Sequence, residues 1–283
     1  MITELAREHY RFIMPFIKGR PDVNVHLLAV IDGTNQGRIY VDNIEHPKTA
    51  LLWAIGSSFA VLGESNNPEF NSYLYDFLKS QLGPTSLSFS GGTHFYLPFY
   101  EKAWQETLDA ILGKVKEDSE FENIETLSYV FDRQKYLHST KTELPLPGNY
   151  EIRKIDASVI QNDTSNILKD DILGDYWISI DAFLAKGFGY CVTSGRHVIS
   201  VCFSGYVSGS YHDCVLRTYN DSDRNKGLAT LVTRAYVEYC IRTHLSPVWN
   251  TTIYNVASQR IAEKCGFELF RKCNTYIFPF DIL

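Results

Sequence analysis

Hydrophobic positions recur along the chain with two spacings, which predict a mixture of strands and helices. In the first half, short apolar runs bounded by turn residues predict strands, and apolar residues three or four positions apart predict helices. The expected strands are residues 25–31, 38–42, 50–54 and 126–131, and the expected helices are residues 70–82, 100–116 and an amphipathic first helix within residues 1–20.

The second half shows the same two spacings. They predict strands at residues 150–155, 189–193, 199–206, 214–219, 248–253 and in the final stretch 267–278. The expected helices are residues 157–168, 176–184, 227–243 and 257–264. This mixture of elements predicts an α/β protein.

The stretch ELPLPGN at residues 143–149 is typical of a linker, because its two prolines and its glycine break any helix or central strand. We therefore expect an N-terminal α/β domain at residues 1–142 and a second domain at residues 143–283. The first domain contains no glycine-rich strand–loop–helix unit, so we expect no second nucleotide there. Its many aromatic residues either fill a core or line a substrate pocket.

Composition then excludes several classes of protein. With 45% hydrophobic and 21% charged residues, the chain is globular, not disordered or a coiled coil. A net charge of −6 disfavours a protein that grips nucleic-acid phosphates. The longest strongly apolar uncharged run, residues 51–63, is too short to span a bilayer, and the first 20 residues lack a cleavage site. We expect a soluble, cytoplasmic protein that binds neither nucleic acid nor membrane.

The six cysteines all follow residue 190 and lack the paired spacing of zinc or redox motifs. Several fall on hydrophobic stretches, where a thiol behaves as a small apolar side chain. We expect reduced core thiols, with zinc or a disulfide framework as the alternative. The histidines show no metal-ligand spacing either, so no metal is expected.

One segment of the second half carries candidate chemistry. After the predicted strand at residues 214–219, a polar loop opens directly onto a helix through the sequence RNKGLAT, which comprises Arg224, Asn225, Lys226, Gly227, Leu228, Ala229 and Thr230. A first helical turn offers free backbone N–H groups and the positive end of the helix dipole. Gly227 lets the main chain approach a phosphate. The alternative is an ordinary helix start with solvated loop charges.

The following segments extend this pattern. The long helix is followed by a strand with PVWN at residues 247–250, by a short helix after Asn255, and by AEKCGF at residues 262–267. This order and these motifs resemble the acetyl-CoA-binding half of the GNAT N-acetyltransferases, and in detail the branch typified by zwittermicin A resistance proteins. The matched motifs cover residues 214–267. Looser similarity includes FLAKGFGYC at residues 183–191 and GRIYVD at residues 37–42.

The resemblance implies a GNAT-like mixed α/β sheet in the C-terminal half and acetyl-CoA as the acyl donor. The RNKGLAT loop would cradle the pyrophosphate of coenzyme A through main-chain N–H groups. The pantetheine arm would pair like an added strand with Arg217, Thr218 and Tyr219. Asn255 and Ser258 would contact that arm, and Asn255 could also cap a helix.

The catalytic residues match the family less well. Many members have a tyrosine acid four residues before the glycine that corresponds to Gly266, where this chain has Ala262. Many also have a glutamate base on the central strand, near Cys214. Asp213 is the candidate base, against a plain strand-edge or turn residue, and Tyr254 is the candidate acid, against a core tyrosine. Cys214 is not expected to be a nucleophile, because the family transfers the acyl group directly.

The resemblance therefore implies an N-acetyltransferase that moves an acetyl group from acetyl-CoA to the amine of a small molecule, such as an aminopolyol, in a ternary complex. The alternative is a non-catalytic acyl-CoA-binding protein with a degenerate site. We expect a monomer or homodimer, with the N-terminal half contributing to the acceptor site.

Overall fold

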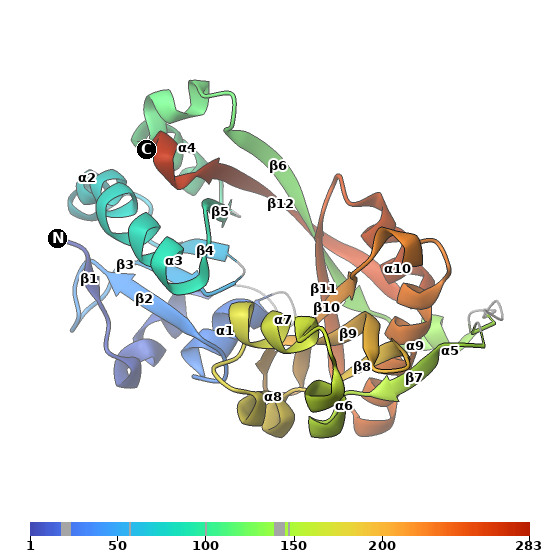
Figure 1. The fold of residues 1–283 in the computed structure, drawn as a ribbon. Coiled ribbons are helices and arrows are strands. Elements are labelled where there is room, and N and C mark those ends of the chain that lie inside the picture. The colour runs from blue at the N-terminus through green and yellow to red at the C-terminus, as the bar shows by residue number, and fades with distance from the viewer. Residues whose placement is uncertain (18–23, 57, 100, 139–144, 147) are drawn as a thin grey trace. The chain divides into compact units, whose positions relative to one another are not determined.

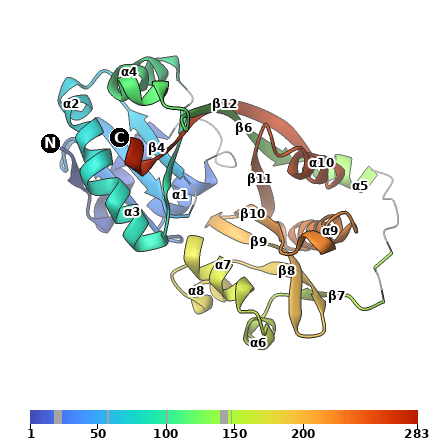
Figure 2. The ribbon, with the colours of Figure 1, turned by 45° about the horizontal axis from the view of Figure 1, so that its top comes forward.

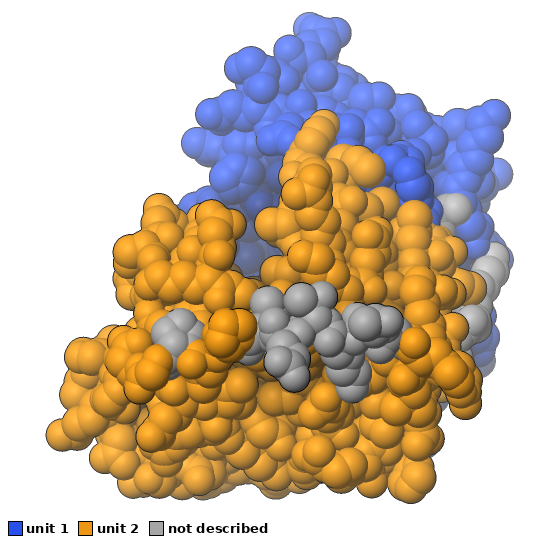
Figure 3. Space-filling model, turned by 90° about the vertical axis from the view of Figure 1, so that its right-hand side faces the viewer, with its two compact units in different colours: residues 1–20, 26–126, 272–283 blue, residues 21–25, 127–271 orange. Residues whose placement is uncertain are grey.

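The computed structural model describes residues 1–17, 24–56, 58–99, 101–138, 145–146 and 148–283, so part of the predicted linker lies outside the described residues. The chain forms two compact units, coloured separately in Figure 3. Unit 1 comprises residues 1–20, 26–126 and 272–283, and unit 2 comprises residues 21–25 and 127–271. The unit boundaries fall inside the strands β6 (Glu122–Phe131) and β12 (Phe267–Pro279). The units therefore differ from the predicted domains 1–142 and 143–283.

The first elements build an antiparallel four-stranded sheet in the order β1-β2-β3-β4. Its strands are β1 (Thr3–Glu4), β2 (Gly37–Val41), β3 (Thr49–Ala54) and β4 (Ser58–Gly63). The other elements of this part are the 3-10 helix η1 (Arg7–Phe16), α1 (Val25–Ile31), α2 (Pro68–Phe77), the π-helical turn η3 (Leu78–Leu82), α3 (Gly83–Ser90), β5 (His94–Phe99), α4 (Lys102–Leu112) and η4 (Gly113–Glu117).

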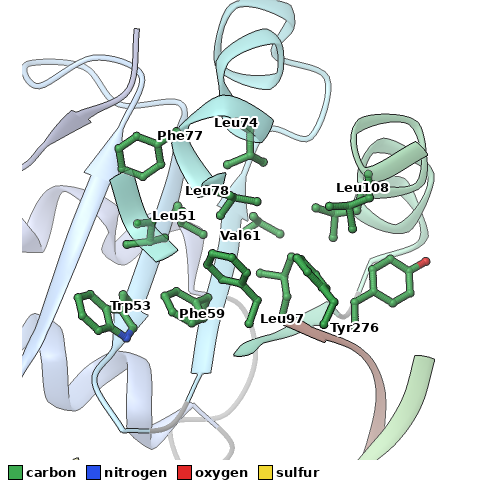
Figure 4. Close-up of a cluster of buried hydrophobic side chains, with 14 of the residues drawn as sticks. Leu51, Trp53, Phe59, Val61, Leu74, Phe77, Leu78, Leu97, Leu108 and Tyr276 are labelled. Atoms are coloured by element: carbon green, nitrogen blue, oxygen red, sulfur yellow. The ribbon is translucent and has the colours of Figure 1, made fainter. Parts of the chain in front are cut away.

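The core of unit 1 lies between this sheet and the helices α2 and α4 (Figure 4). It contains Leu51 and Val61 from the sheet and Leu74 from α2, all of which are buried. Eight aromatic residues of the first half are buried in this cluster: Tyr40, Trp53, Phe59, Phe70, Phe77, Phe95, Phe99 and Trp104. Those residues fill a core, as one of the two sequence interpretations held.

The remaining strands form an eight-stranded sheet in the order β5-β12-β6-β11-β10-β9-β8-β7 (Figure 1). The strands of unit 2 are β7 (Glu151–Lys154), β8 (Gly189–Ser194), β9 (His197–Ser208), β10 (Tyr211–Thr218) and β11 (Ser246–Thr252). Its helices are α5 (Arg133–His138), α6 (Ala157–Asn162), α7 (Ile167–Asp175), α8 (Ile180–Lys186), α9 (Leu228–Thr243) and α10 (Val256–Lys264), with a short 3-10 turn η5 (Asp221–Asp223).

The helices of unit 2 cover both faces of its strands (Figure 2). Cys202 of β9 packs in the cluster that contains Tyr236 and Cys240 of α9. The next residue, Phe203, contacts Phe183 of α8 and Tyr176 after α7. Because successive side chains of a strand point to opposite faces, α9 lies on one face and α7 and α8 lie on the other.

The predicted elements of the second half are confirmed to within a few residues, except that the helices expected at residues 157–168 and 176–184 are the three shorter helices α6, α7 and α8. All six cysteines are free and buried, which confirms the expected core thiols. Within the described part of the chain, no helix has the length and apolarity to cross a membrane.

Two expectations for the first half were wrong, and two of its strands were not predicted. Val25–Ile31 is a helix, not a strand, because a short continuous apolar run does not distinguish the two. The first helix is a short strand and a 3-10 helix that contains Pro15, whose missing N–H disfavours a regular α-helix. The apolar run at residues 51–63 holds most of β3 and all of β4, with Gly56 at a φ of 82° between them, and β4 and β5 were not predicted.

Candidate active site

The strands β10 and β11 run parallel, but they pair over only three residues. Tyr211, His212 and Asp213 lie opposite Ser246, Pro247 and Val248, and no further pairs of these strands occur among the described residues. A register shift in the pairing of β10 with β9, between His212 and Cys214, marks a bulge at the same place. Beyond Asp213, one edge of β10 is therefore free to bond to another extended chain.

The pairing of β10 with β9 tells which main-chain groups face this free edge. The N–H of Tyr219 donates to the carbonyl of Ile199 on β9. Polar groups alternate between the two edges of an antiparallel strand, so Thr218 and Leu216 direct their main-chain groups away from β9. The sequence analysis indicated Arg217, Thr218 and Tyr219 as the residues that pair with a pantetheine arm. In the observed register, the main-chain groups of Leu216 and Thr218 face the free edge, and those of Arg217 and Tyr219 face β9.

The free edge leads to the start of α9. Gly227 is the N-cap residue in a left-handed conformation, with a φ of 78°, which glycine adopts without strain. Among the described residues no side chain caps this helix, and its first turn carries no acidic residue. The side chains of Leu228 and Thr230 are buried, and Ala229 is half-buried. The first turn thus presents N–H donors and a positive dipole end.

Both cations of the loop form ion pairs with aspartates three residues earlier. Arg224 Nη1 lies 3.1 Å from Asp221 Oδ1, and both side chains are largely exposed. Lys226 Nζ lies 2.8 Å from Asp223 Oδ1. Asn225, between the two cations, has a φ of 61°, which is uncommon for a residue other than glycine.

Asn255 and Ser258 lie at the start of α10, after β11. The side chain of Asn255 accepts a hydrogen bond from the Ser258 N–H at 3.0 Å, so Asn255 caps the helix as its alternative role required. The Ser258 hydroxyl accepts a hydrogen bond from Trp249 Nε1 at 3.0 Å, which ties the helix start to the buried face of β11. The side-chain NH₂ group of Asn255 and the hydroxyl of Ser258 can still donate hydrogen bonds to a ligand.

Asp213 lies at the point where the two strands separate. It is 6% exposed, and its Oδ1 accepts a hydrogen bond of 3.1 Å from the side-chain amide of Asn250 on β11. Burial raises the pKa of the neighbouring Tyr176 and Tyr206, and the negative charge of Asp213 adds to both shifts. Asp213 is thus a buried residue of β10, at the place where its pairing with β11 ends, and not a turn residue. Its role as a base stays a prediction.

The structure places the other catalytic candidates differently. Tyr254 is 72% exposed in the turn before α10, so it is not a core tyrosine. Ala262, a residue of α10, is fully buried and has no polar side chain to offer. Burial raises the pKa of the Cys214 thiol far above its usual range, so the thiol stays protonated and is a poor nucleophile.

A cluster of charged residues on the α7 face was not predicted. Arg217 of β10 lies 3.1 Å from Asp171 and 3.4 Å from Asp175, both on α7, and the Tyr219 hydroxyl donates to Asp171 at 2.8 Å. Burial raises the pKa of both aspartates, and Arg217 partly offsets this. Asp213, Asp171, Asp175 and Arg217 all act on the pKa of Tyr176, so three carboxylates and one guanidinium lie near that residue.

The geometry of this region suits coenzyme A. An unpaired strand edge matches the two amides of a pantetheine arm, and an uncapped helix start with glycine at its N-cap matches a pyrophosphate. In the described residues, no group of three or more His, Cys, Asp or Glu side chains has the arrangement of a metal site.

Comparison with known proteins agrees with this geometry. The sequence pattern described as GNAT acetyltransferase matches residues 16–276. The chain is 25% identical over 248 residues, or 88% of each chain, to the uncharacterized N-acetyltransferase YdfB of Bacillus subtilis.

Solved structures show the same fold. A GCN5-related N-acetyltransferase-like protein from Streptococcus suis has a TM-score of 0.66 at 20% identity, covering 95% of this chain and 98% of that one. A tandem GNAT protein from the clavulanic acid biosynthesis pathway has a TM-score of 0.60 at 11% identity, covering 99% and 98%. From the match of nearly its whole length, the chain belongs to the GNAT acetyltransferase family, whose members are acetyl-CoA-dependent N-acetyltransferases.

Proposed function

We propose that the chain acetylates the amine of a small molecule by direct attack of the amine on acetyl-CoA in a ternary complex. The observation that carries the proposal is the junction of β10 and α9, where a free strand edge leads into an uncapped helix start. The edge groups of Leu216 and Thr218 would bond to the pantetheine amides. The N–H groups of the first turn of α9, with Arg224 nearby, would bind the pyrophosphate.

Bound acetyl-CoA supplies the thioester carbon, to which the C–N bond forms as the C–S bond breaks. The acceptor must first lose a proton, because an ammonium ion has no lone pair. We assign this proton to Asp213, which lies at the end of the free edge and is held by Asn250. A main-chain N–H of the free edge of β10 would stabilise the oxyanion, and Tyr254 is the proposed donor of a proton to the leaving thiolate.

The charges of unit 2 support a cationic acceptor. Asp171, Asp175 and Asp213 outnumber Arg217 on the face that carries α7, and this excess of negative charge favours an ammonium group. The resemblance of the chain's motifs to those of the zwittermicin A resistance branch supports an aminopolyol-type acceptor in particular. Release of free thiol from acetyl-CoA, measured with a panel of aminopolyols and simple amines, tests the proposal.

The substitution Asp213→Asn tests the assigned base. The new amide oxygen can still accept from Asn250, so the fold and the acetyl-CoA affinity should be retained. Loss of a general base lowers kcat by about a hundredfold or more. Asp221→Asn, a loss of the same charge from an exposed site, is the matched control and should turn over at the wild-type rate. Equal turnover by Asp213→Asn would remove Asp213 from the mechanism.

One observation favours a second candidate, a non-catalytic acyl-CoA-binding protein. Ala262 occupies the position where many family members have an acidic tyrosine, and it is fully buried, so no substitute group can act from that position. This candidate predicts that acetyl-CoA binds and that no amine of the panel releases thiol above the hydrolysis rate. Amine-dependent thiol release would exclude it.

A further inference from the structure

The side chain of Lys226 is held by two others, one three residues earlier in the chain and one from the residue that precedes β7. Its Nζ donates to Asp223 Oδ1 at 2.8 Å and to the Tyr150 hydroxyl at 3.1 Å. The Tyr150 hydroxyl donates to the same Asp223 oxygen at 2.7 Å, and the ammonium lies 5.6 Å from the centre of the Tyr150 ring. We call these three side chains, Tyr150, Asp223 and Lys226, the loop clamp.

The two ion pairs of the loop differ in their exposure to water. The side chain of Asp223 is 11% exposed, whereas that of Asp221, the partner of Arg224, is 88% exposed. The hydrogen bonds from Lys226 and Tyr150 lower the pKa of Asp223, and the bond to Asp223 raises the pKa of Lys226, so this pair stays ionised at neutral pH. A cation in an exposed ion pair can change partners at little cost in free energy. Removing the cation from a carboxylate that is sheltered from water costs more.

The backbone around Lys226 needs such a support. Asn225 and Gly227, on either side of Lys226, both have left-handed conformations with φ values of 61° and 78°. A left-handed residue other than glycine persists where its surroundings hold it. The clamp fixes the side chain between these two residues, and so it fixes the direction in which the chain enters α9.

We propose that Tyr150, Asp223 and Lys226 are positioning residues that hold the cofactor loop in its binding conformation, whereas Arg224 is the loop side chain that reaches the phosphates. This inference rests on the proposed coenzyme A site. It departs from the expectation that Lys226 adds charge near the phosphate, because its ammonium is already bonded to Asp223 and Tyr150. Arg224 can leave Asp221, since both side chains lie in water.

Asp221 and Asp223 allow a test of the loop clamp against simple competition for cations. The two hypotheses predict opposite changes in acetyl-CoA affinity for one of the two variants. Asp221→Asn and Asp223→Asn each remove one negative charge from the same loop. If both aspartates only compete with phosphate for cations, both variants bind acetyl-CoA about two- to threefold more tightly, as expected for one exposed like charge removed. If the clamp positions the loop, Asp221→Asn still tightens binding, but Asp223→Asn weakens it by about fivefold or more.

Tyr150→Phe is a second variant that keeps the ring against Lys226 and removes only the hydroxyl. The clamp predicts a weaker affinity for acetyl-CoA, with a higher KM and an unchanged kcat at saturation, because no clamp atom touches the acyl group. In a double-mutant cycle, Tyr150→Phe and Asp223→Asn should be non-additive, whereas Tyr150→Phe and Arg224→Met should add. If Tyr150 and Asp223 only stabilise the fold, their variants should lower the thermal midpoint without this combination of a raised KM, an unchanged kcat and non-additive affinities.

Titration calorimetry with acetyl-CoA on the full-length chain decides the matter. Weaker binding by Asp223→Asn and Tyr150→Phe, with equal or tighter binding by Asp221→Asn, supports the clamp. If wild type binds and Asp223→Asn binds as tightly as Asp221→Asn, the clamp is overturned and the proposed cofactor site stands. If wild type itself does not bind acetyl-CoA, the proposed function and the clamp both fall.

Discussion

The chain contains two strand–turn–helix junctions at matching places in the order of elements, β4 to α2 in unit 1 and β10 to α9 in unit 2. Each junction follows three successive antiparallel strands. At α2 the N-cap is Asn67, whose side chain accepts from the Phe70 N–H at 3.1 Å. Pro68 occupies the first turn and Glu69 adds a negative charge. At α9 the N-cap is glycine, and the first turn is free of proline and acid.

These few residues decide what each helix start can bind. At α2, one N–H is absent because of Pro68, another is already bonded to Asn67, and Glu69 repels anions. Asn67 also donates to Asp42 and Thr49, which fixes the cap in place. At α9 the donors remain available. The same order of elements therefore supports a phosphate site in unit 2 and only a structural helix start in unit 1, and the ability to bind lies in the cap rather than in the fold.

Gly227→Asp should have the largest effect on this comparison. It places a carboxylate where the pyrophosphate is expected, and two like charges 4 Å apart in a partly shielded site repel by about 4 kcal/mol. Acetyl-CoA affinity should fall at least tenfold and up to about a thousandfold. Aspartate tolerates a left-handed conformation better than most residues, so stability should fall by only about 1 kcal/mol.

The matched control is Asn67→Asp, which puts the same charge at the start of α2. Aspartate is a good N-cap, so the variant should fold and bind acetyl-CoA like wild type. Titration calorimetry and thermal melting of both variants measure the contrast. Wild-type binding by a folded Gly227→Asp variant would refute the assignment of α9.

Acid should weaken unit 2 through His212. Burial lowers the pKa of His212 from 6.5 to about 4, and its Nδ1 lies 2.9 Å from the Ser204 hydroxyl. Between these values the unfolded chain binds a proton that the folded chain does not, so stability falls as the pH drops through that range. The loss amounts to at most about 3 kcal/mol.

Urea unfolding at pH 7.5 and pH 5 measures this loss, with the variant His212→Asn as the comparison. Asparagine can still bond to Ser204 but does not titrate there. The difference between the two pH values should therefore shrink in the variant. An unchanged difference would mean that other groups cause the acid sensitivity.

The two capping asparagines, Asn67 and Asn255, should give the smallest difference in acetyl-CoA affinity between the two helix starts. Asn67→Ala and Asn255→Ala each remove a cap bond of similar length, and each should lower stability by about 1–2 kcal/mol. Only Asn255→Ala should also weaken acetyl-CoA binding, by about fivefold, because its amide is proposed to contact the pantetheine arm. Equal affinities of the two variants would limit Asn255 to its capping role.

The sequence predicted the loop before α9 and the strands around it because their signals are local. The glycine at position 227, the polar loop before it and the apolar strand before that lie within about twenty residues, and the structure keeps that order. By contrast, α1 was taken for a strand, because seven apolar residues fit either element until the tertiary contacts select one.

The residues that the sequence did not reveal act over long distances along the chain. Asp171 and Asp175 meet Tyr219 and Arg217 across 48 and 42 residues, Asn250 meets Asp213 across 37, and Tyr150 meets Asp223 across 73. No local spacing records such contacts. Asp213 could be named as a candidate base from its position, but its burial and its amide partner depend on how two strands separate.

We propose that α9 begins a coenzyme A site and that α2 does not. Hydrogen exchange of the full-length chain with and without saturating acetyl-CoA, together with the binding stoichiometry from calorimetry, tests it most directly. We expect one molecule bound per chain, with slower exchange at residues 214–230 and unchanged exchange at residues 63–72. Two molecules per chain, or protection at the start of α2 without protection at the start of α9, would contradict it.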